Sequence, residues 1–315
     1  MGREIRDLIS TAGIQGLKLI AAEEDAAGIL TEEAGEPALA ASLTVESLED
    51  ARVVFLAGSG ESAARALELG SPAVYIDLTH TAEERPNARL RAPMVEPAGY
   101  TAPADAVQVV AHPAAIGIAL LLTRIHQVHP IRRSVIHVFE PASERGRAGV
   151  EELQQQTVNL LSFKSLPKAV YDEQLSFNML ARYGEEAPFA LEDAEARLER
   201  HLATLLAHAE DALPMPSVRL VQAPVFHGHS MSFWIEFEEN PGAAEVEALL
   251  AVPHVDVREA GMEPPTAVGM AGQSGIAVGA VVPDLNEPGA CWLWAAADNL
   301  RLSAENAVAV ALQFL

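Results

Sequence analysis

The first half of the chain alternates short apolar, β-branched runs with stretches of helical character. Residues 51–58 (ARVVFLAG), 72–78 (PAVYIDL) and 107–113 (VQVVAHP) have the composition of buried strands, and the first of them leads into the helical stretch ESAARALEL. Strands separated by helices pair in parallel, and the helices then cover the sheet. The sequence therefore predicts an α/β domain with a parallel sheet, to which residues 17–22 (LKLIAA) add a further strand.

The second half has a mixed pattern. Residues 218–226 and 231–238 alternate apolar and polar side chains, which is typical of antiparallel strands with one solvated face. Helices are expected at 147–163, 191–212 and 300–315, and further strands at 132–140, 267–273, 276–283 and 291–297. These elements predict an α+β domain with a mixed, largely antiparallel sheet. We expect the last helix to pack back on the first domain.

Charge and cysteine content restrict the classes of partner. The chain has 44 acidic and 21 basic residues, a net charge of −23. Such a surface repels nucleic acid and anionic lipid, so neither is expected as a partner. The single cysteine, Cys291, excludes a disulfide framework within the chain and fits a reducing cytoplasm. It lies in an apolar run (GACWLWAA), where a free thiol is usually an inert core residue.

The turn at residues 111–115 (AHPAA) stands between a strand and an apolar helix. Enzymes with α/β folds often hold a nucleophile at such a turn, near the positive end of the helix dipole. This turn carries His112, Pro113, Ala114 and Ala115, and none of these is a Ser, Cys or Thr. The sequence thus predicts a site-like turn that lacks a reactive atom.

Other polar residues each allow two interpretations. His227 and His229 in VFHGHSMSF have the spacing of a metal-binding pair, but no third ligand is near and we predict no metal site. His229 alone fits a general base or a hydrogen-bonded structural histidine. Glu140, at a strand end, fits a catalytic carboxylate or a solvated strand end. Arg145 and Arg147 fit an anion site or surface pairs with neighbouring carboxylates.

Several segments together resemble the aspartate-semialdehyde dehydrogenase family. The segment EPASERGRAGVEELQQQTVNLL is similar to the family's Ser-Gly-x-Gly turn and the helix after it, APVFHGHSMSF to the strand that carries the catalytic His, and WLWAAADNLRLSAENAVAVALQFL to the closing segment. The Arg-Gly-Arg turn is most similar to the Usg branch. The resemblance implies a Rossmann-like NAD(P)-binding domain at 1–113 plus 299–315, a dimerisation and substrate domain at 114–298, and a homodimer.

The family's chemistry uses a Cys thiolate that attacks the aldehyde and a His that moves the proton, while hydride passes to NADP. The resemblance assigns the catalytic His to His229. It puts Ala115 at the nucleophile position and His112 at the position of an Asn. A methyl group cannot form the covalent intermediate.

The substrate side departs from the family in the same way. The resemblance puts Glu140 at the position of a substrate-site Gln, where a carboxylate repels a carboxylate substrate. Gln222 stands at the position of the substrate-binding Arg, so the bidentate clamp is lost. The resemblance also aligns Glu195 and Arg197 with a pair in the family, an acidic and a basic residue that are separated by one position.

The sequence contains only some of the residues that would bind a cofactor. The turn of Gly58, Ser59 and Gly60 fits a phosphate cradle or an ordinary tight βα turn. The resemblance adds Ser143, Gly146 and Asn299, with Gly2 as the last glycine of a Gly-rich fingerprint before the helical stretch REIRDLISTAGI. The first strand and the rest of the fingerprint have no match. We therefore expect the true start to lie upstream, and NADP to bind only if an upstream Gly-rich loop exists.

These departures favour a catalytically inactive relative, kept for its homodimeric fold or for binding a ligand, with no certain cofactor. One alternative is an NADP-dependent oxidoreductase that acts on an aldehyde or carbonyl in aspartate-family metabolism without a Cys nucleophile, with His229 as acid and base. Another is a structural partner that forms mixed dimers with an active homologue.

Overall fold

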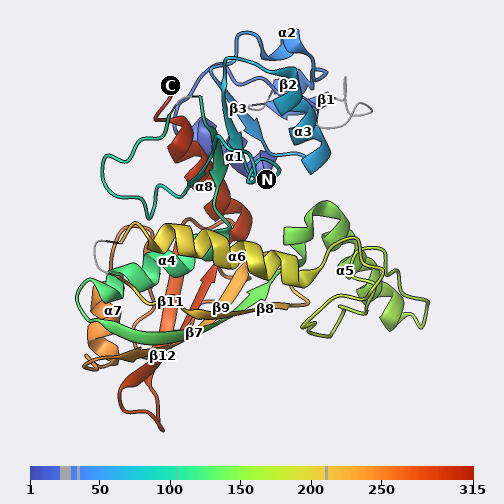
Figure 1. The fold of residues 1–315 in the computed structure, drawn as a ribbon. Coiled ribbons are helices and arrows are strands. Elements are labelled where there is room, and N and C mark those ends of the chain that lie inside the picture. Colours follow the sequence, from blue (N-terminus) through green and yellow to red (C-terminus); the bar gives the residue numbers. More distant parts are fainter. Residues whose placement is uncertain (22–29, 34–35, 104, 210–211) are drawn as a thin grey trace. The chain divides into compact units, whose positions relative to one another are not determined.

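The computed structural model describes residues 1–21, 30–33, 36–103, 105–209 and 212–315 (Figure 1). The chain divides into two compact units. Unit 1 consists of residues 1–111 and 303–315, and unit 2 of residues 112–302. The division after Ala111 falls within the site-like turn AHPAA.

Unit 1 is built on a four-stranded parallel sheet in the order β3-β4-β6-β5. The strands are β3 (Val53–Leu56), β4 (Val74–Asp77), β5 (Ala88–Arg91) and β6 (Val107–Val110). The predicted parallel sheet is therefore confirmed. Strand β5 was not predicted because its sequence, ARLR, is polar. Arg91 is nevertheless fully buried, since its Nε and Nη2 donate to the two carboxylate oxygens of Glu96 at 2.8 and 3.0 Å.

The helices of unit 1 are α1 (Gly2–Thr11), α2 (Val45–Leu48) and α3 (Gly60–Leu69), and a separate hairpin joins β1 (Leu30–Glu33) to β2 (Glu36–Leu39). The end of α8 (Asn299–Ala311) packs on α1 through Ala304 and Val308, so the last helix does return to this unit.

The strand predicted at 17–22 is wrong over its described residues. Ile20 forms a single bridge with Ala41, while Leu17 packs against α1 and α8.

A cavity of about 610 Å³ lies beside β3, the edge strand of the sheet of unit 1. Its walls come from α1, residues 14–21, β3 and α3, and they are mainly apolar. Two residues predicted to bind a cofactor, Gly2 and Gly58, lie on its lining. The outer edge of β3 therefore faces space that no described strand fills.

Unit 2 is built on a six-stranded sheet in the order β10-β11-β12-β9-β7-β8. The strands are β7 (Ile131–Glu140), β8 (Ser217–Gln222), β9 (His229–Phe237), β10 (Val255–Val257), β11 (Ile276–Pro283) and β12 (Ala290–Ala297). The β7–β9, β9–β12 and β11–β12 pairs are antiparallel and the two outer pairs are parallel, which confirms the predicted mixed sheet. The strand predicted at 267–273 is wrong, because these residues form turns that include Gly272 at positive φ.

Helices α4 (Pro113–His126) and α6 (Leu191–Leu206) lie side by side across one face of this sheet (Figure 1). Helix α4 is apolar almost all round and is buried along most of its length, as its sequence predicts. Unit 2 also contains the 3-10 turn η2 (Ala142–Arg145), α5 (Gly146–Leu161) and α7 (Ala243–Leu250). Among the described residues, no helix is long and apolar enough to cross a membrane.

Candidate functional site

The first turn of α4 is a rigid, buried corner. Pro113 occupies the first helical position, where its missing N–H costs nothing, and His112 is the N-cap. The Nδ1 atom of His112 accepts a hydrogen bond from the N–H of Ala114 at 3.2 Å. The backbone N–H of His112 donates to Nδ1 of His201 on α6 at 2.9 Å. Ala115, in the same turn, is fully buried and presents only a methyl group there.

His229 begins β9 and is 1% exposed. Neither of its ring nitrogens has a hydrogen-bond partner among the described residues. Burial lowers the pKa of His229 below its usual range, against the opposing charges of Glu144 and Asp298. The imidazole is therefore neutral at pH 7, with one nitrogen carrying a lone pair. His227, the other histidine of the H-x-H motif, is exposed, whereas His229 is buried.

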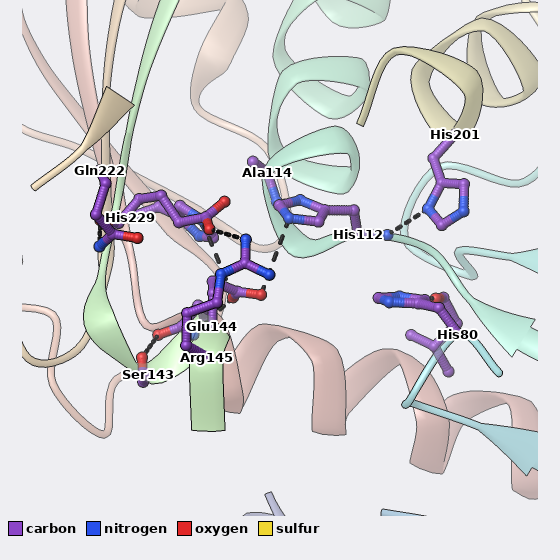
Figure 2. A network of polar contacts seen from close by, with 12 residues as sticks. His80, His112, Ala114, Ser143, Glu144, Arg145, His201, Gln222 and His229 are labelled. Atoms are coloured by element: carbon purple, nitrogen blue, oxygen red, sulfur yellow. Dashed lines mark hydrogen bonds and ion pairs between the residues drawn. The ribbon is translucent and has the colours of Figure 1, made fainter. Parts of the chain in front are cut away.

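Glu144, in η2, lies between His112 and His229 (Figure 2). Its Oε2 is 3.9 Å from Nε2 of His112, and its Oε1 is 4.0 Å from Nε2 of His229. The two imidazole rings are 5.5 Å apart between centroids. This cluster has no signature in the sequence, because its members are far apart in the chain and Glu144 belongs to no local motif beyond its neighbouring arginines.

Asn299 holds the surroundings of Glu144 in place. Its Nδ2 donates to Oε1 of Glu144 at 2.7 Å. Its Oδ1 accepts from the hydroxyl of Ser143 at 3.1 Å and from the N–H of Gly228 at 3.0 Å. Ser143 and Asn299, two predicted cofactor residues, thus contact each other, and Gly146 ends η2 at a φ of 64°.

A second polar group joins the ends of β7 and β8. Glu140 is fully buried, and its Oε1 accepts from Nη2 of Arg145 at 2.5 Å. Burial raises the pKa of Glu140 to about 7 against the attraction of Arg145. The solvated strand end predicted for Glu140 is therefore wrong, and so is a surface partner for Arg145. Arg147 does form the expected surface pair, with Glu151.

Gln222 lies directly opposite Glu140 in the β7–β8 register. Its Oε1 accepts from the hydroxyl of Tyr183 at 2.6 Å, and its Nε2 donates to the carbonyl oxygen of Glu140 at 2.8 Å. Both ends of the amide are therefore used within the protein. No sequence motif indicates Tyr183, whose hydroxyl also accepts from Nε of Arg145 at 3.1 Å.

The remaining predicted site residues have structural contacts of their own. Glu195, on α6, accepts from Nη1 of Arg219 at 3.0 Å and from the N–H of Leu220 at 2.7 Å. The positive charge of Arg197 favours the ionised form of Glu140 and so opposes the rise of its pKa.

In unit 1, Ser59 caps α3 by accepting from the N–H of Ser62 at 3.2 Å, and a side chain at Gly60 would meet Thr81. The turn at 58–60 thus has the close packing of a tight βα turn.

Comparison with known proteins agrees with this architecture. Residues 122–302 match the model of the semialdehyde dehydrogenase dimerisation domain. The chain is 30% identical over 207 residues to an aspartate-semialdehyde dehydrogenase from Rickettsia bellii, a match that covers 64% of this chain and 60% of that protein. It is 33% identical over 218 residues to a USG-1 protein homolog from Azotobacter vinelandii, covering 68% and 61%. These two matches span about three fifths of the relatives' own length.

A solved structure is similar over nearly its whole length. It is described as a probable aspartate-semialdehyde dehydrogenase from Pseudomonas aeruginosa, with a TM-score of 0.83 and 26% identity over 99% of this chain and 94% of that one. The fold and the matched domain together define a protein of the semialdehyde dehydrogenase class. Within that class, the chain belongs to the aspartate-semialdehyde dehydrogenase family, and USG-1 homologs are among its relatives. The family and the α/β fold class inferred from the sequence are thereby confirmed.

Proposed function

We propose that this chain is a homodimeric member of the family that does not catalyse thiol-dependent semialdehyde dehydrogenation and serves as a binding protein. The observation that carries this proposal is Ala115, fully buried in the first turn of α4. An acyl-enzyme intermediate requires a nucleophile at the reacting carbon, and the side chain at this corner has none.

Cys291 does not replace the missing nucleophile. It lies on β12 with 1% of its surface exposed. Burial raises the pKa of the Cys291 thiol to about 12, so the reactive thiolate is almost absent at neutral pH.

The substrate side supports the same proposal. Gln222 is bonded to Tyr183 and to the backbone, and the guanidinium of Arg145 is already paired with Glu140. An acidic substrate that approaches this group meets a buried carboxylate instead of a bidentate guanidinium clamp.

The test is an assay of NADP reduction with aspartate semialdehyde and phosphate, on the full protein and on His229→Ala. We expect no turnover above the rate of the His229→Ala variant, because the covalent step has no nucleophile. A rate well above that variant would overturn the proposal. An Ala115→Cys variant is the complementary test for gain of activity, because it places a thiol in the first turn of α4.

The second candidate is an oxidoreductase that passes hydride directly to a carbonyl. The observation in its favour is His229, a buried neutral imidazole whose ring nitrogens have no hydrogen-bond partner among the described residues. Oxidation of NADPH by an aldehyde, abolished in His229→Ala and retained in His227→Ala, would establish this activity in place of the binding role.

A further inference from the structure

Three side chains of unit 2 bring possible metal-ligand atoms close together. They are His112 and His229, each with a ring nitrogen, and Glu144, with a carboxylate oxygen. These three atoms all lie within 4.8 Å of one another. The residues come from the start of α4, from η2 and from the start of β9, and Figure 2 shows Glu144 beside His112. Two imidazoles and one carboxylate form a ligand set that protein metal sites use.

His229 supplies an independent sign of a missing ligand. It is 1% exposed, and both ring nitrogens are buried without a hydrogen-bond partner in the described part of the chain. A buried polar group without a partner is costly, and most such groups in folded proteins are satisfied. A bound cation would satisfy one of these nitrogens directly.

We propose that His112, Glu144 and His229 bind one divalent first-row transition ion, with Zn²⁺ as the reference case. Imidazole nitrogen favours such ions, whereas Ca²⁺ and Mg²⁺ prefer sites made wholly of oxygen ligands. Three protein ligands leave at least one coordination position for water or another small ligand. The site therefore has the composition of an open centre and not of a closed structural one.

The residues around the site orient its carboxylate. Asn299 donates to Oε1 of Glu144 and is itself held by Ser143 and Gly228. Such contacts behind a metal ligand fix its direction. Arg145, the neighbour of Glu144, points its guanidinium to Glu140, so its charge is neutralised there.

Closure on an ion requires small shifts. Ligand atoms lie about 2.0–2.2 Å from a zinc ion, and the present separations of 3.9 and 4.0 Å are wider than a tetrahedral site needs. The Glu144 side chain is 16% exposed, against 5% for His112 and 1% for His229. Glu144 is therefore the ligand most open to solvent, and it reaches the ion by a small shift that keeps the hydrogen bond from Asn299.

The ring of His112 must also change its tautomer. Its Nδ1 accepts from the N–H of Ala114, which leaves the ring proton on Nε2. Coordination through Nε2 moves this proton to Nδ1 and ends the bond to Ala114. The loss of one such hydrogen bond lowers the affinity about tenfold, a small part of what three ligands provide.

The experiment is a titration of the metal-free full protein with Co²⁺ and Zn²⁺, followed by calorimetry and by the visible absorption of Co²⁺. We expect one equivalent to bind per chain. Three variants, His112→Asn, Glu144→Gln and His229→Ala, should each lower the affinity at least about 100-fold, since even residues behind the ligands contribute 10- to 100-fold. In His112→Asn the helix keeps a favourable N-cap residue, so the fold of α4 is preserved.

His227→Ala is the matched control, because His227 is an exposed histidine two residues from His229 and should leave binding unchanged. A shift of the Ala114 amide resonance on Zn²⁺ addition, absent in His112→Asn, reports the tautomer change. The proposal is overturned if the protein binds no ion, or if the three variants bind as tightly as the unmodified chain. These readouts do not depend on turnover, so they stand apart from the assay of the proposed function.

Discussion

The residues of η2 face two groups of partners. Ser143 and Glu144 both contact Asn299, and Glu144 also faces His112 and His229. Arg145 instead pairs with Glu140. A 3-10 helix has three residues per turn, so neighbouring side chains are about 120° apart. One short turn can therefore support a polar cluster on one side and a buried ion pair on the other.

The burial of Cys291 leads to a prediction about its reactivity. Because burial raises the pKa of its thiol to about 12, the folded protein should resist alkylation by iodoacetamide at pH 8. In urea the thiol is exposed and should react at the rate of an ordinary cysteine. Mass spectrometry of the labelled protein measures both rates. Rapid labelling of the folded chain at pH 8 would contradict the buried position of Cys291.

At the residue scale, the sequence singled out individual residues but not their partners. It marked His229 through a local motif and Ala115 through its turn. It did not indicate that Glu144 meets two histidines, because the three residues are separated by 32 and 85 positions and only the folded sheet brings them together. Glu140 was misjudged for a similar reason, since its burial depends on Arg145 and on β8.

At the scale of elements, strands and helices with strong apolar periodicity were predicted within a few residues. The elements that were not predicted are β1, β2, α2, β5, α7 and β10, and two predicted strands are wrong. Strand β5 is held by a buried Arg91–Glu96 pair that no hydropathy pattern reveals. Residues 267–273 are apolar enough for a strand, but they form turns, in which Gly272 adopts a positive φ.

The contact between α5 and η2 depends on one glycine. A Cβ atom at Gly149 would lie 2.5 Å from the carbonyl oxygen of Ala142 and 2.7 Å from the hydroxyl of Tyr171. We expect Gly149→Ala to lower the free energy of unfolding by about 1–3 kcal/mol, as overpacking does, measured by urea denaturation. Gly2→Ala is the control, since nothing lies within 4 Å of its added atom. Equal stability of the two variants would contradict the close contact.

At the scale of the whole molecule, the sheet of unit 2 has two unlike faces. Helices α4 and α6 cover one of them. The other carries Trp234 and Trp292, which lie opposite each other on β9 and β12 and both donate to Asp284. Trp292 is 37% exposed. Apolar surface of this kind is typical of an interface between subunits.

Light scattering should therefore give twice the mass of one chain for the unmodified protein. Trp292→Lys should shift the population toward monomer, because a charge at a two-fold interface is introduced twice. Val128→Lys, at an exposed position after α4, should leave the dimer intact. A monomeric unmodified protein would contradict the homodimer and favour the mixed dimer with a homologue.

The two units should differ in their resistance to urea. Unit 1 contains the cavity of about 610 Å³ beside β3, and apolar walls that stay open to solvent add nothing to hydrophobic stabilisation. Unit 1 should therefore unfold at a lower urea concentration than unit 2. Unit 1 has Tyr75 and Tyr100, whereas unit 2 has Tyr171, Tyr183 and all three tryptophans, Trp234, Trp292 and Trp294. As urea rises, tyrosine emission should change first, while tryptophan emission still reports an intact sheet.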